Sequence, residues 1–309
     1  MVCVVTGGAG FIGSHLVDAL VAQNKRVIVI DSLCAGSRDN LAGHLDEGTV
    51  SLLPCDLLGD GWQQALDGAE RVCHLAADPD VRMSSVSPES QIRNNIVASF
   101  RVLEAMRAGS AGEILFTSTS TVYGDATLLP TPEDYTPLEP ISVYGASKLA
   151  CEALIASYCH TYGMTAWIYR FANIIGSRSG HGVIPDFIGK LRKNPCSLEI
   201  LGDGTQSKSY LMVDECVDAM LFAAVHAKDR YNVFNIGSDD WVDVTTIAEI
   251  VCDEMELRNV SFHYTGGSRG WAGDVPKMQL SIERMKALGW SPKRGSRESV
   301  REAARAMVR

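Results

Sequence analysis

The chain lacks the paired cysteines that would indicate a disulfide framework or a structural zinc site. Its nine cysteines are scattered, odd in number and form no Cys-x-x-Cys motif, whereas such sites need paired or closely spaced ligands. The seven histidines are dispersed as well. We therefore expect no bound metal and reduced thiols, as is usual for a cytoplasmic protein.

The sequence also lacks an apolar stretch of membrane-spanning length, and no charged and apolar leader precedes the first predicted strand. Basic residues are not in excess, because 37 Asp and Glu outnumber 28 Lys and Arg and give a net charge of −9. This charge disfavours nucleic acid or an anionic membrane as the main partner. We expect a cytoplasmic globular protein whose length allows one large domain or two smaller ones.

The amino terminus contains a glycine-rich turn between a strand and a helix. The apolar run 2–5 predicts a buried parallel strand, and it leads directly into Gly8-x-Gly10-x-x-Gly13. Apolar residues then recur at helical spacing over 11–20. Such a turn lets the backbone approach a pyrophosphate, and the start of the helix supplies free N–H groups and the positive end of a dipole.

A second predicted strand, residues 27–30, ends in Asp31. A carboxylate at this place can accept hydrogen bonds from the ribose hydroxyls of an adenosine, and it repels a 2′-phosphate. The sequence therefore favours NAD over NADP as a cofactor. The alternative is a glycine-rich turn without a ligand, which the order of strand, glycines, helix, strand and acid argues against.

Strands and helices alternate through the first half of the chain. Further strands are predicted at 50–54, 71–75, 113–118 and 165–170, and long helices at 88–108 and 142–162. This alternation predicts an α/β protein with a Rossmann-type, doubly wound parallel sheet. Both long helices carry apolar residues on more than one face, so we expect a homodimer that pairs them in a four-helix interface.

The pattern becomes irregular after about Asn173. Helix-like segments at 213–227, 244–256 and 296–308 alternate with short strand-like runs. We expect residues 1–173 to form the dinucleotide-binding domain. Residues 174–309 would form a smaller, mixed α/β substrate-binding subdomain, with the chain able to cross between the two.

Tyr144 and Lys148 are spaced so that a helix would place them on one face, about one turn apart. A neighbouring ammonium lowers the pKa of a phenol because it favours the phenolate, which makes a base able to take a proton from an alcohol. A pair on a helix surface without any catalytic role is the simpler alternative. The glycine turn in the same chain favours the catalytic interpretation.

With the glycine turn, Asp31 and the Tyr144–Lys148 pair, the chain resembles the extended short-chain dehydrogenases/reductases. Among these it resembles the UDP-glucose 4-epimerases and related sugar-nucleotide epimerases over nearly its whole length. The matching motifs are TGGAGFIG (6–13), DSL (31–33), CDL (55–57), HLAA (74–77), NN (94–95), TSTSTVYGD (117–125), PISVYGASK (140–148), RFANIIG (170–176), GDGTQSKSYLMVDE (202–215) and GWAGDV (270–275).

The resemblance implies a role for each matching position. It makes Tyr144 the base, assisted by Lys148 and Thr119. The positions implied to hold NAD, besides Tyr144 and Lys148, are Gly7, Gly10, Phe11, Ile12, Gly13, Asp31, Ser32, Asp56, Leu57, Leu75, Ala76, Ala77, Asn94 and Ser118. The positions implied to bind the nucleotide sugar are Thr119, Thr121, Asn173, Val183, Lys208, Arg269 and Asp274.

The implied reaction is the reversible inversion of C4 in a UDP-hexose, UDP-glucose or UDP-galactose, through a 4-keto sugar. A 4,6-dehydratase would need acids after the catalytic threonine, where this chain has Ser120 and Thr121. Lys208 stands where many relatives have arginine, and the resemblance implies that Met278 takes the position of the family's gate on sugar size. An N-acetylated or uronic acid substrate, a net dehydrogenase and a non-catalytic NAD-sensing module remain alternatives.

Overall fold

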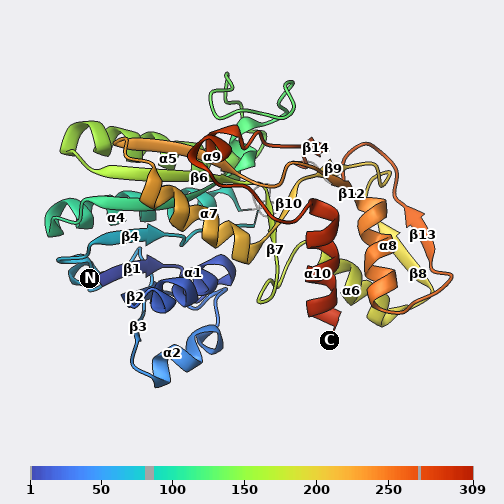
Figure 1. The fold of residues 1–309 in the computed structure, drawn as a ribbon, viewed down its shortest axis with the longest axis horizontal. Coiled ribbons are helices and arrows are strands. Elements are labelled where there is room, and N and C mark those ends of the chain that lie inside the picture. Colours follow the sequence, from blue (N-terminus) through green and yellow to red (C-terminus); the bar gives the residue numbers. More distant parts are fainter. Residues whose placement is uncertain (1, 81–86, 271–272, 309) are drawn as a thin grey trace.

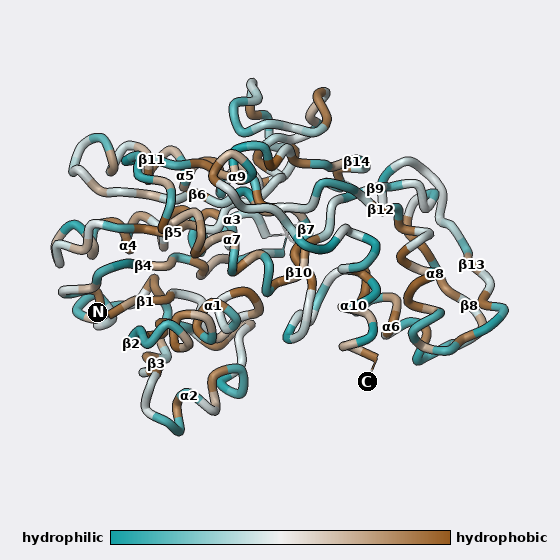
Figure 2. The backbone as a smooth tube through the Cα atoms, viewed as in Figure 1, coloured by the Kyte–Doolittle hydropathy of each residue, from teal (hydrophilic) through white to brown (hydrophobic). Residues whose placement is uncertain are grey.

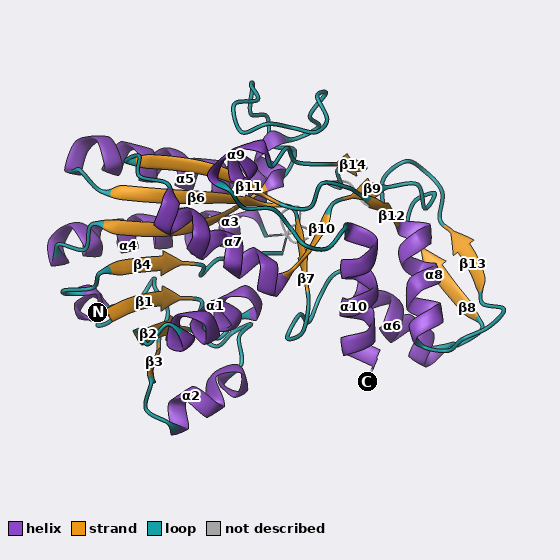
Figure 3. Cartoon of the chain, in the orientation of Figure 1, coloured by secondary structure: helices purple, strands orange, loops and turns teal. Residues whose placement is uncertain are grey.

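The computed structural model describes residues 2–80, 87–270 and 273–308, so Trp271 and Ala272 of the GWAGDV motif lie outside the described residues. The chain forms a large lobe around a seven-stranded parallel sheet and a small lobe at the other end of the molecule (Figure 1, Figure 3). The strands of the large sheet are β1 (Val2–Thr6), β2 (Arg26–Asp31), β3 (Val50–Pro54), β4 (Arg71–His74), β5 (Glu113–Thr119), β6 (Thr165–Phe171) and β11 (Tyr231–Ile236). The predicted α/β, doubly wound fold is confirmed.

Helices cover both faces of this sheet. On one face lie α1 (Phe11–Ala22) and α7 (Val213–His226), and on the other α4 (Ala98–Gly109) and α5 (Val143–Tyr162). Each pair of helices buries its apolar side chains against β-branched and aromatic residues of the strands, which gives two separate cores. Figure 2 shows hydrophobic residues recurring along α1 and hydrophilic residues in the outer loops.

The sheet order, β11-β6-β5-β4-β1-β2-β3, reverses between β1 and β4. In open α/β sheets, ligands bind outside the carboxyl ends of the strands at such a reversal. The glycine turn follows β1 and Leu75 follows β4, so both lie at this point. The topology therefore selects one edge of the sheet for the site.

The long helix predicted over 88–108 is present but is not uniformly α-helical. It consists of α3 (Pro88–Gln91), a π-helical stretch (Ile92–Val97) and α4. π-Helical turns occur mostly as single insertions, often at functional sites. Asn95 lies in this stretch and is buried, so the wider turn aims an amide into the interior.

The small lobe packs three helices around its own core. These are α6 (Val183–Lys193), α8 (Val244–Glu254) and α10 (Ser296–Val308), beside the two-stranded sheet of β8 (Ser197–Ile200) and β13 (Ser261–Tyr264). Helix α6 is not among the helices predicted from the sequence. The remaining short elements are η1 (Arg38–Leu41), α2 (Ala42–Asp46), η2 (Gln63–Leu66), η5 (Ser120–Tyr123), β7 (Asn173–Ile175), β9 (Ser207–Lys208), β10 (Tyr210–Met212), β12 (Val242–Asp243), β14 (Lys277–Met278) and α9 (Glu283–Leu288).

The chain crosses back into the large lobe after the start of the small one. Strand β11 pairs in parallel with β6, and α7 packs on α1. Residues 174–309 are therefore not confined to the small lobe, and the division at residue 173 stays a prediction of the sequence. None of the described helices has the length and apolarity needed to cross a membrane.

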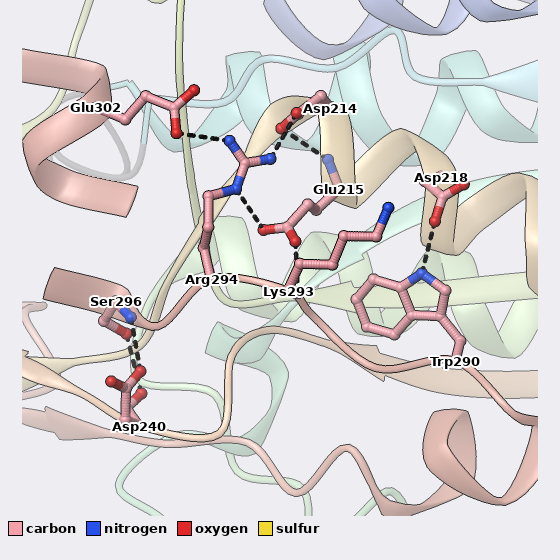
Figure 4. A network of polar contacts seen from close by, with 9 residues as sticks. All are labelled: Asp214, Glu215, Asp218, Asp240, Trp290, Lys293, Arg294, Ser296 and Glu302. Atoms are coloured by element: carbon pink, nitrogen blue, oxygen red, sulfur yellow. Dashed lines mark hydrogen bonds and ion pairs between the residues drawn. The ribbon is translucent and has the colours of Figure 1, made fainter. Parts of the chain in front are cut away.

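A polar network joins the start of α7 to the segment before α10 (Figure 4). Arg294 forms ion pairs with Glu215 at 3.3 Å, with Glu302 at 2.7 Å and with Asp214 at 2.5 Å. The carboxylate of Glu215 is 7% exposed and also accepts a hydrogen bond from the backbone of Lys293 at 2.6 Å. Because α7 covers the large sheet, this network fixes the small lobe to the large one.

We expect Glu215→Ala to lower the free energy of unfolding by about 1–3 kcal/mol, because it leaves the backbone N–H of Lys293 without its acceptor and removes the most buried of the three carboxylates around Arg294. Glu302→Ala is the matched control, since the Glu302 side chain is 51% exposed and its loss should change stability by less than about 1 kcal/mol. Thermal and urea unfolding of the three proteins measures the difference. Equal losses in both variants would contradict the assigned role of Glu215.

Candidate active site

The glycine turn brings β1 and the end of β4 into direct backbone contact. Gly7 has a φ of +71°, and a Cβ there would lie 2.7 Å from the backbone nitrogen of Ala76. A Cβ on Gly13 would lie 2.1 Å from the carbonyl oxygen of Gly7. Both positions therefore require glycine. Helix α1 begins at Phe11 with no side-chain cap, so its first N–H groups suit a pyrophosphate.

The carboxylate of Asp31 connects this turn to the end of β2. It accepts hydrogen bonds from the backbone N–H of Ala9 at 2.9 Å and of Leu33 at 2.8 Å. A carboxylate offers about four acceptor positions, so two remain for ribose hydroxyls. Ser32 donates to the Cys34 thiol at 3.1 Å. The residues present at this edge therefore fit a dinucleotide.

Asp56 and Leu57 follow the next strand, β3. Asp56 accepts a hydrogen bond from the backbone N–H of Leu58 at 2.8 Å, and Leu57 is buried. Asp31 and Asp56 thus lie at the carboxyl ends of neighbouring parallel strands, as β2 pairs with β3. The structure brings these two predicted residues to the same edge as the glycine turn.

His74 holds the end of β4 in place. Its ring nitrogens pair with the hydroxyls of Thr6 at 2.7 Å and Ser99 at 2.9 Å, and Thr6 also accepts from the N–H of Ala76 at 3.3 Å. Burial, and then the charge of Lys148, lowers the pKa of His74 to about 3, so the ring is neutral. It is a packed histidine that positions residues 75–77 beside the glycine turn.

Thr119 ends β5, and its hydroxyl forms a hydrogen bond with the phenol of Tyr144. The Thr119 oxygen also accepts from the backbone N–H of Thr121 at 3.2 Å and from the Thr121 hydroxyl at 3.1 Å. A hydroxyl has one proton and two acceptor positions. With both acceptor positions used by Thr121, the Thr119 proton is directed at the phenol oxygen.

The pKa of Tyr144 differs from the sequence-based expectation. Burial raises this pKa above its ordinary value, while the hydrogen bond from Thr119 opposes the rise. The Lys148 ammonium instead donates to the carbonyl oxygen of Thr117 at 2.8 Å. The predicted lowering of the phenol pKa by Lys148 is thus wrong for the protein alone, because burial removes the hydration of the phenolate and the group that opposes the rise is Thr119, not Lys148.

Lys148 is a buried cation, 3% exposed, although lysines are rarely buried without a charged partner. Its ammonium also lies 4.6 Å from the centre of the Phe116 ring, where the face of the ring attracts a cation. Burial lowers the pKa of Lys148 to about 8, and the neighbouring Cys151 and Glu152 oppose the change. The Lys148 ammonium therefore keeps its charge at neutral pH and loses its proton only slightly above it, near pH 8.

The two neighbouring asparagines, Asn94 and Asn95, have different partners, although the resemblance assigned a role to Asn94 alone. The Asn94 amide donates to Ser90 at 3.0 Å. The buried Asn95 amide donates to the Ser147 hydroxyl on α5 at 2.8 Å, and its oxygen accepts from the N–H of Asp78 at 2.8 Å. Asn95 was not selected from the sequence, since nothing there shows which of two adjacent asparagines a π-helical turn directs inward.

Besides Thr119 and Thr121, the residues expected to bind the nucleotide sugar lie on β7, α6, β9 and the segment before β14. Lys208 pairs with Asp274 at 2.5 Å, and Arg269 donates to the Asp274 carbonyl at 2.5 Å. Arg269 also pairs with Asp125 at 2.7 Å, a residue that the sequence analysis missed. These residues form one cluster in which both cations already have carboxylate partners.

Three other predicted positions have contacts of a different kind. Asn173 donates its amide to the carbonyl oxygen of Ser209 at 3.1 Å, which joins β7 to β10. Val183 is the first residue of α6, is half-buried and packs against the core of the small lobe. Ser118 donates its hydroxyl to Glu152. The structure therefore gives each of these side chains a partner within the protein.

The chain matches a family of known proteins over most of its length. The model of the NAD dependent epimerase/dehydratase family matches residues 3–237. A putative UDP-glucose 4-epimerase of Methanocaldococcus jannaschii is 32% identical over 302 residues, which are 96% of this chain and 95% of that protein.

Solved structures agree with this match. A UDP-galactose 4-epimerase superposes with a TM-score of 0.90 at 40% identity, covering 99% of this chain and 98% of the other. The Thermus thermophilus UDP-glucose 4-epimerase in complex with NAD gives 0.87 at 28%, covering 99% and 98%. A Methanobrevibacter ruminantium UDP-N-acetylglucosamine 4-epimerase in complex with UDP-N-acetylmuramic acid gives 0.89 at 29%, covering 99% and 97%. The predicted NAD cofactor is thereby confirmed.

The buried charge of Lys148 makes the free energy of unfolding depend on pH. Between about pH 8 and its ordinary value of 10.5, the unfolded chain binds more protons at this lysine than the folded chain, so stability should rise with pH. Below pH 8 the burial of the cation weakens the fold by on the order of 3 kcal/mol. We expect Lys148→Met to raise the free energy of unfolding at pH 7 while turnover is lost.

Urea unfolding at pH 7 and pH 9.5 measures this effect, and the gap between Lys148→Met and the unaltered protein should narrow at the higher pH. Lys193→Met is the control, because Lys193 is exposed and its replacement should change neither value. A Lys148→Met protein that is less stable than the original at pH 7 would show that hydrogen bonding to Thr117 outweighs desolvation.

Proposed function

Because the chain belongs to the NAD dependent epimerase/dehydratase family, we propose that it reversibly inverts C4 of a UDP-hexose, UDP-glucose or UDP-galactose, through a 4-keto sugar. The observation that carries this proposal is the phenol of Tyr144 hydrogen-bonded to Thr119, one helical turn from the buried ammonium of Lys148. This group lies at the sheet edge where the glycine turn would hold the cofactor.

The chain's own residues hold the cofactor in this proposal. The glycine turn and the start of α1 bind the pyrophosphate, and Asp31 accepts hydrogen bonds from the adenosine ribose. Bound NAD supplies a reversible acceptor for the hydrogen carried by the sugar carbon. Lys148 keeps a positive charge at the nicotinamide end of the site.

Tyr144 takes the proton from the sugar hydroxyl and later returns it. Its raised pKa in the protein alone means that the phenolate needs additional stabilisation before it can act as a base near neutral pH. The proton of Thr119 already points at the phenol oxygen, and the charge of Lys148 and that of the oxidised cofactor act in the same direction. The phenol, Thr119 and Thr121 form one chain of hydroxyls along which the proton is held.

The cluster of Lys208, Arg269 and Asp274 would bind the nucleotide part of the substrate. Its two cations are preformed, because carboxylates hold them in place, and a diphosphate is the anion that two such groups suit. Lysine gives a point charge where arginine would give a planar, two-pronged contact. The sugar would lie toward Tyr144, held less tightly so that both epimers are accepted.

Alternative activities within the family are separated by their products. The relatives include a UDP-N-acetylglucosamine 4-epimerase and a UDP-glucuronic acid decarboxylase at 30% identity, so an N-acetylated or uronic acid sugar competes as substrate. A net dehydrogenase would accumulate NADH. An NAD-sensing module would bind the cofactor without any turnover, and the retained Tyr144, Lys148 and Thr119 argue against it.

The proposal includes a homodimer in the cytoplasm. Large apolar side chains are exposed on the outer helices of one sheet face, among them Val97 and Phe100 near or on α4 and Tyr162 on α5. A second copy that pairs α4 and α5 with its own would bury them. The nine cysteines are all free, in keeping with reduced thiols.

The purified protein, incubated with UDP-galactose, should produce UDP-glucose without a matching amount of NADH. Chromatography of the nucleotide sugars and the absorbance of NADH measure the two quantities in one sample. Accumulated NADH without UDP-glucose would favour a net dehydrogenase. Parallel samples with UDP-N-acetylgalactosamine and UDP-glucuronate identify the competing substrates.

Tyr144→Phe should abolish turnover and leave NAD binding intact, because it removes only the phenol oxygen. General-base catalysis of this kind contributes on the order of 10²- to 10⁴-fold. Tyr162→Phe is the matched control, since Tyr162 lies at the far end of the same helix and the substitution keeps the apolar ring that a dimer would bury, so the variant should retain full activity. Retained turnover in Tyr144→Phe would remove the phenol from its assigned role.

Met278→Ala should favour N-acetylated sugars over unsubstituted ones. Met278 is buried in a cluster with Val122, Tyr123, Ala172 and Leu280, beside the loop that follows Thr119. A smaller side chain enlarges this region at a cost of about 2–5 kcal/mol in stability. The ratio of kcat/KM for the two sugar classes measures the effect, and Leu280→Ala, from the same cluster, should leave that ratio unchanged.

A further inference from the structure

Three side chains along one face of α5 contact three consecutive residues of β5. Tyr144 bonds Thr119, and Lys148 donates to the carbonyl of Thr117. Glu152, one turn further along, accepts a hydrogen bond from the Ser118 hydroxyl. Residues four apart on a helix lie on the same face, so these contacts fix how far α5 can slide or turn relative to the end of β5.

The third side chain, Glu152, has a negative charge that no step of the proposed reaction uses. Glu152 is 2% exposed and Arg170 is 5% exposed. The Arg170 guanidinium donates from Nη2 to Oε2 of Glu152 at 2.7 Å and from Nε to Oε1 at 3.1 Å. Arg170 lies on β6 directly opposite Ser118 on β5. The carboxylate therefore joins α5 to two adjacent strands.

This ion pair extends to the loop that follows Thr119. The second terminal nitrogen of Arg170 donates to the Tyr123 hydroxyl at 3.0 Å and to the carbonyl of Glu133 at 3.1 Å. The Tyr123 hydroxyl in turn donates to the Asn235 side chain on β11 at 2.7 Å. The segment from Ser118 to Tyr123 is thus held at both ends. Glu152 and Tyr144 contact Ser118 and Thr119 at its start, and Arg170 contacts Tyr123 at its end.

We propose that Glu152 is a positioning residue for the reaction, which places the Ser118–Thr119 end of β5 against Tyr144 and supplies the negative charge that faces Lys148. This inference rests on the proposed function. Burial lowers the pKa of Lys148 to about 8, and the charge of Glu152 opposes that change. Without this charge, the lysine would lose its proton at a lower pH.

Other ionisable groups also surround this region. They are Tyr144 and Cys151 on α5, His74 on β4, Tyr123 on η5, Arg170 on β6, Tyr231 on β11, and Asp78 and Glu133 on the flanking loops. Burial lowers the pKa of His74 to about 3 and raises that of Tyr231, so both are neutral between pH 6 and 10. Glu152 is the carboxylate among them that raises the pKa of Lys148.

The test is Glu152→Gln in the NAD-loaded protein. The amide keeps the shape and can still accept from Ser118, but it lacks the charge. We expect kcat to fall by on the order of 10²-fold with KM nearly unchanged, because the amide NH2 cannot accept from Arg170 and the Ser118–Thr119 end of β5 is then no longer held against Tyr144. The alkaline fall of the kcat–pH profile should move to lower pH by about one unit.

Two variants separate positioning from general loss of stability. Glu254→Gln is the matched control, because Glu254 also accepts from two arginines, Arg301 and Arg305, but lies between α8 and α10. It should leave the pH profile unchanged. Glu152→Asp keeps the charge but shortens the side chain, so kcat should fall while the alkaline limb stays in place. The proposal would be overturned if kcat of Glu152→Gln fell at the same alkaline pH as that of the unaltered protein. It would also be overturned if Glu152→Asp kept the kcat of the unaltered protein.

A readout independent of turnover distinguishes this inference from the proposed function. The ¹³Cε signal of Lys148, assigned by its loss in Lys148→Met, can be titrated by NMR in the loaded protein. The Lys148 pKa should be lower by about one unit in Glu152→Gln than in the unaltered protein. If that pKa falls and no UDP-hexose is epimerised, the electrostatic role of Glu152 stands and the substrate assignment fails. An unchanged pKa overturns the role itself.

Discussion

The packing of α5 against the carboxyl end of β5 is the contact on which the candidate active site depends. Tyr144, Lys148 and Glu152 each bind one residue of the segment 117–119. The strand supplies two hydroxyls and one carbonyl, and the helix supplies a phenol, a cation and an anion. Because both elements belong to the buried core of the large lobe, a shift of either would break several hydrogen bonds at once. The geometry of the site is therefore set by the same packing that stabilises the fold.

Burial gives these groups their chemistry and also makes the site unfavourable for stability. A lysine at 3% exposure loses hydration that one carbonyl and an aromatic face do not fully replace. The same burial raises the pKa of Tyr144, so the phenol stays protonated in the protein alone. A cofactor with a positive ring would supply what the protein lacks, which links base strength to cofactor binding.

The two lobes meet through polar contacts of different kinds. Arg294 and Glu215 form a well-packed network that fixes the lobes to each other. Lys208 and Arg269 are held instead by Asp274 and Asp125, and a phosphate could exchange for these carboxylates. The Arg294–Glu215 contact fixes the position of one lobe relative to the other. The carboxylates of Asp274 and Asp125 instead keep Lys208 and Arg269 in place, so that these two cations are paired. Loop residues are suited to such a binding role because rigid elements position them.

The sequence by itself determined the fold class, the NAD cofactor and the edge of the sheet that carries the glycine turn and Asp31, because strand periodicity and glycine spacing are local properties of the chain. It did not indicate α6, the short strands β7, β9 and β10, or the return of β11 to the large sheet, since strands of two or three residues have no period of their own and the order of a sheet depends on contacts distant in sequence. It also did not reveal Asn95, Asp125 or the Glu152–Arg170 pair as parts of the site. Those roles arise only when segments distant in sequence are buried together, and desolvation then decides which groups keep their charge.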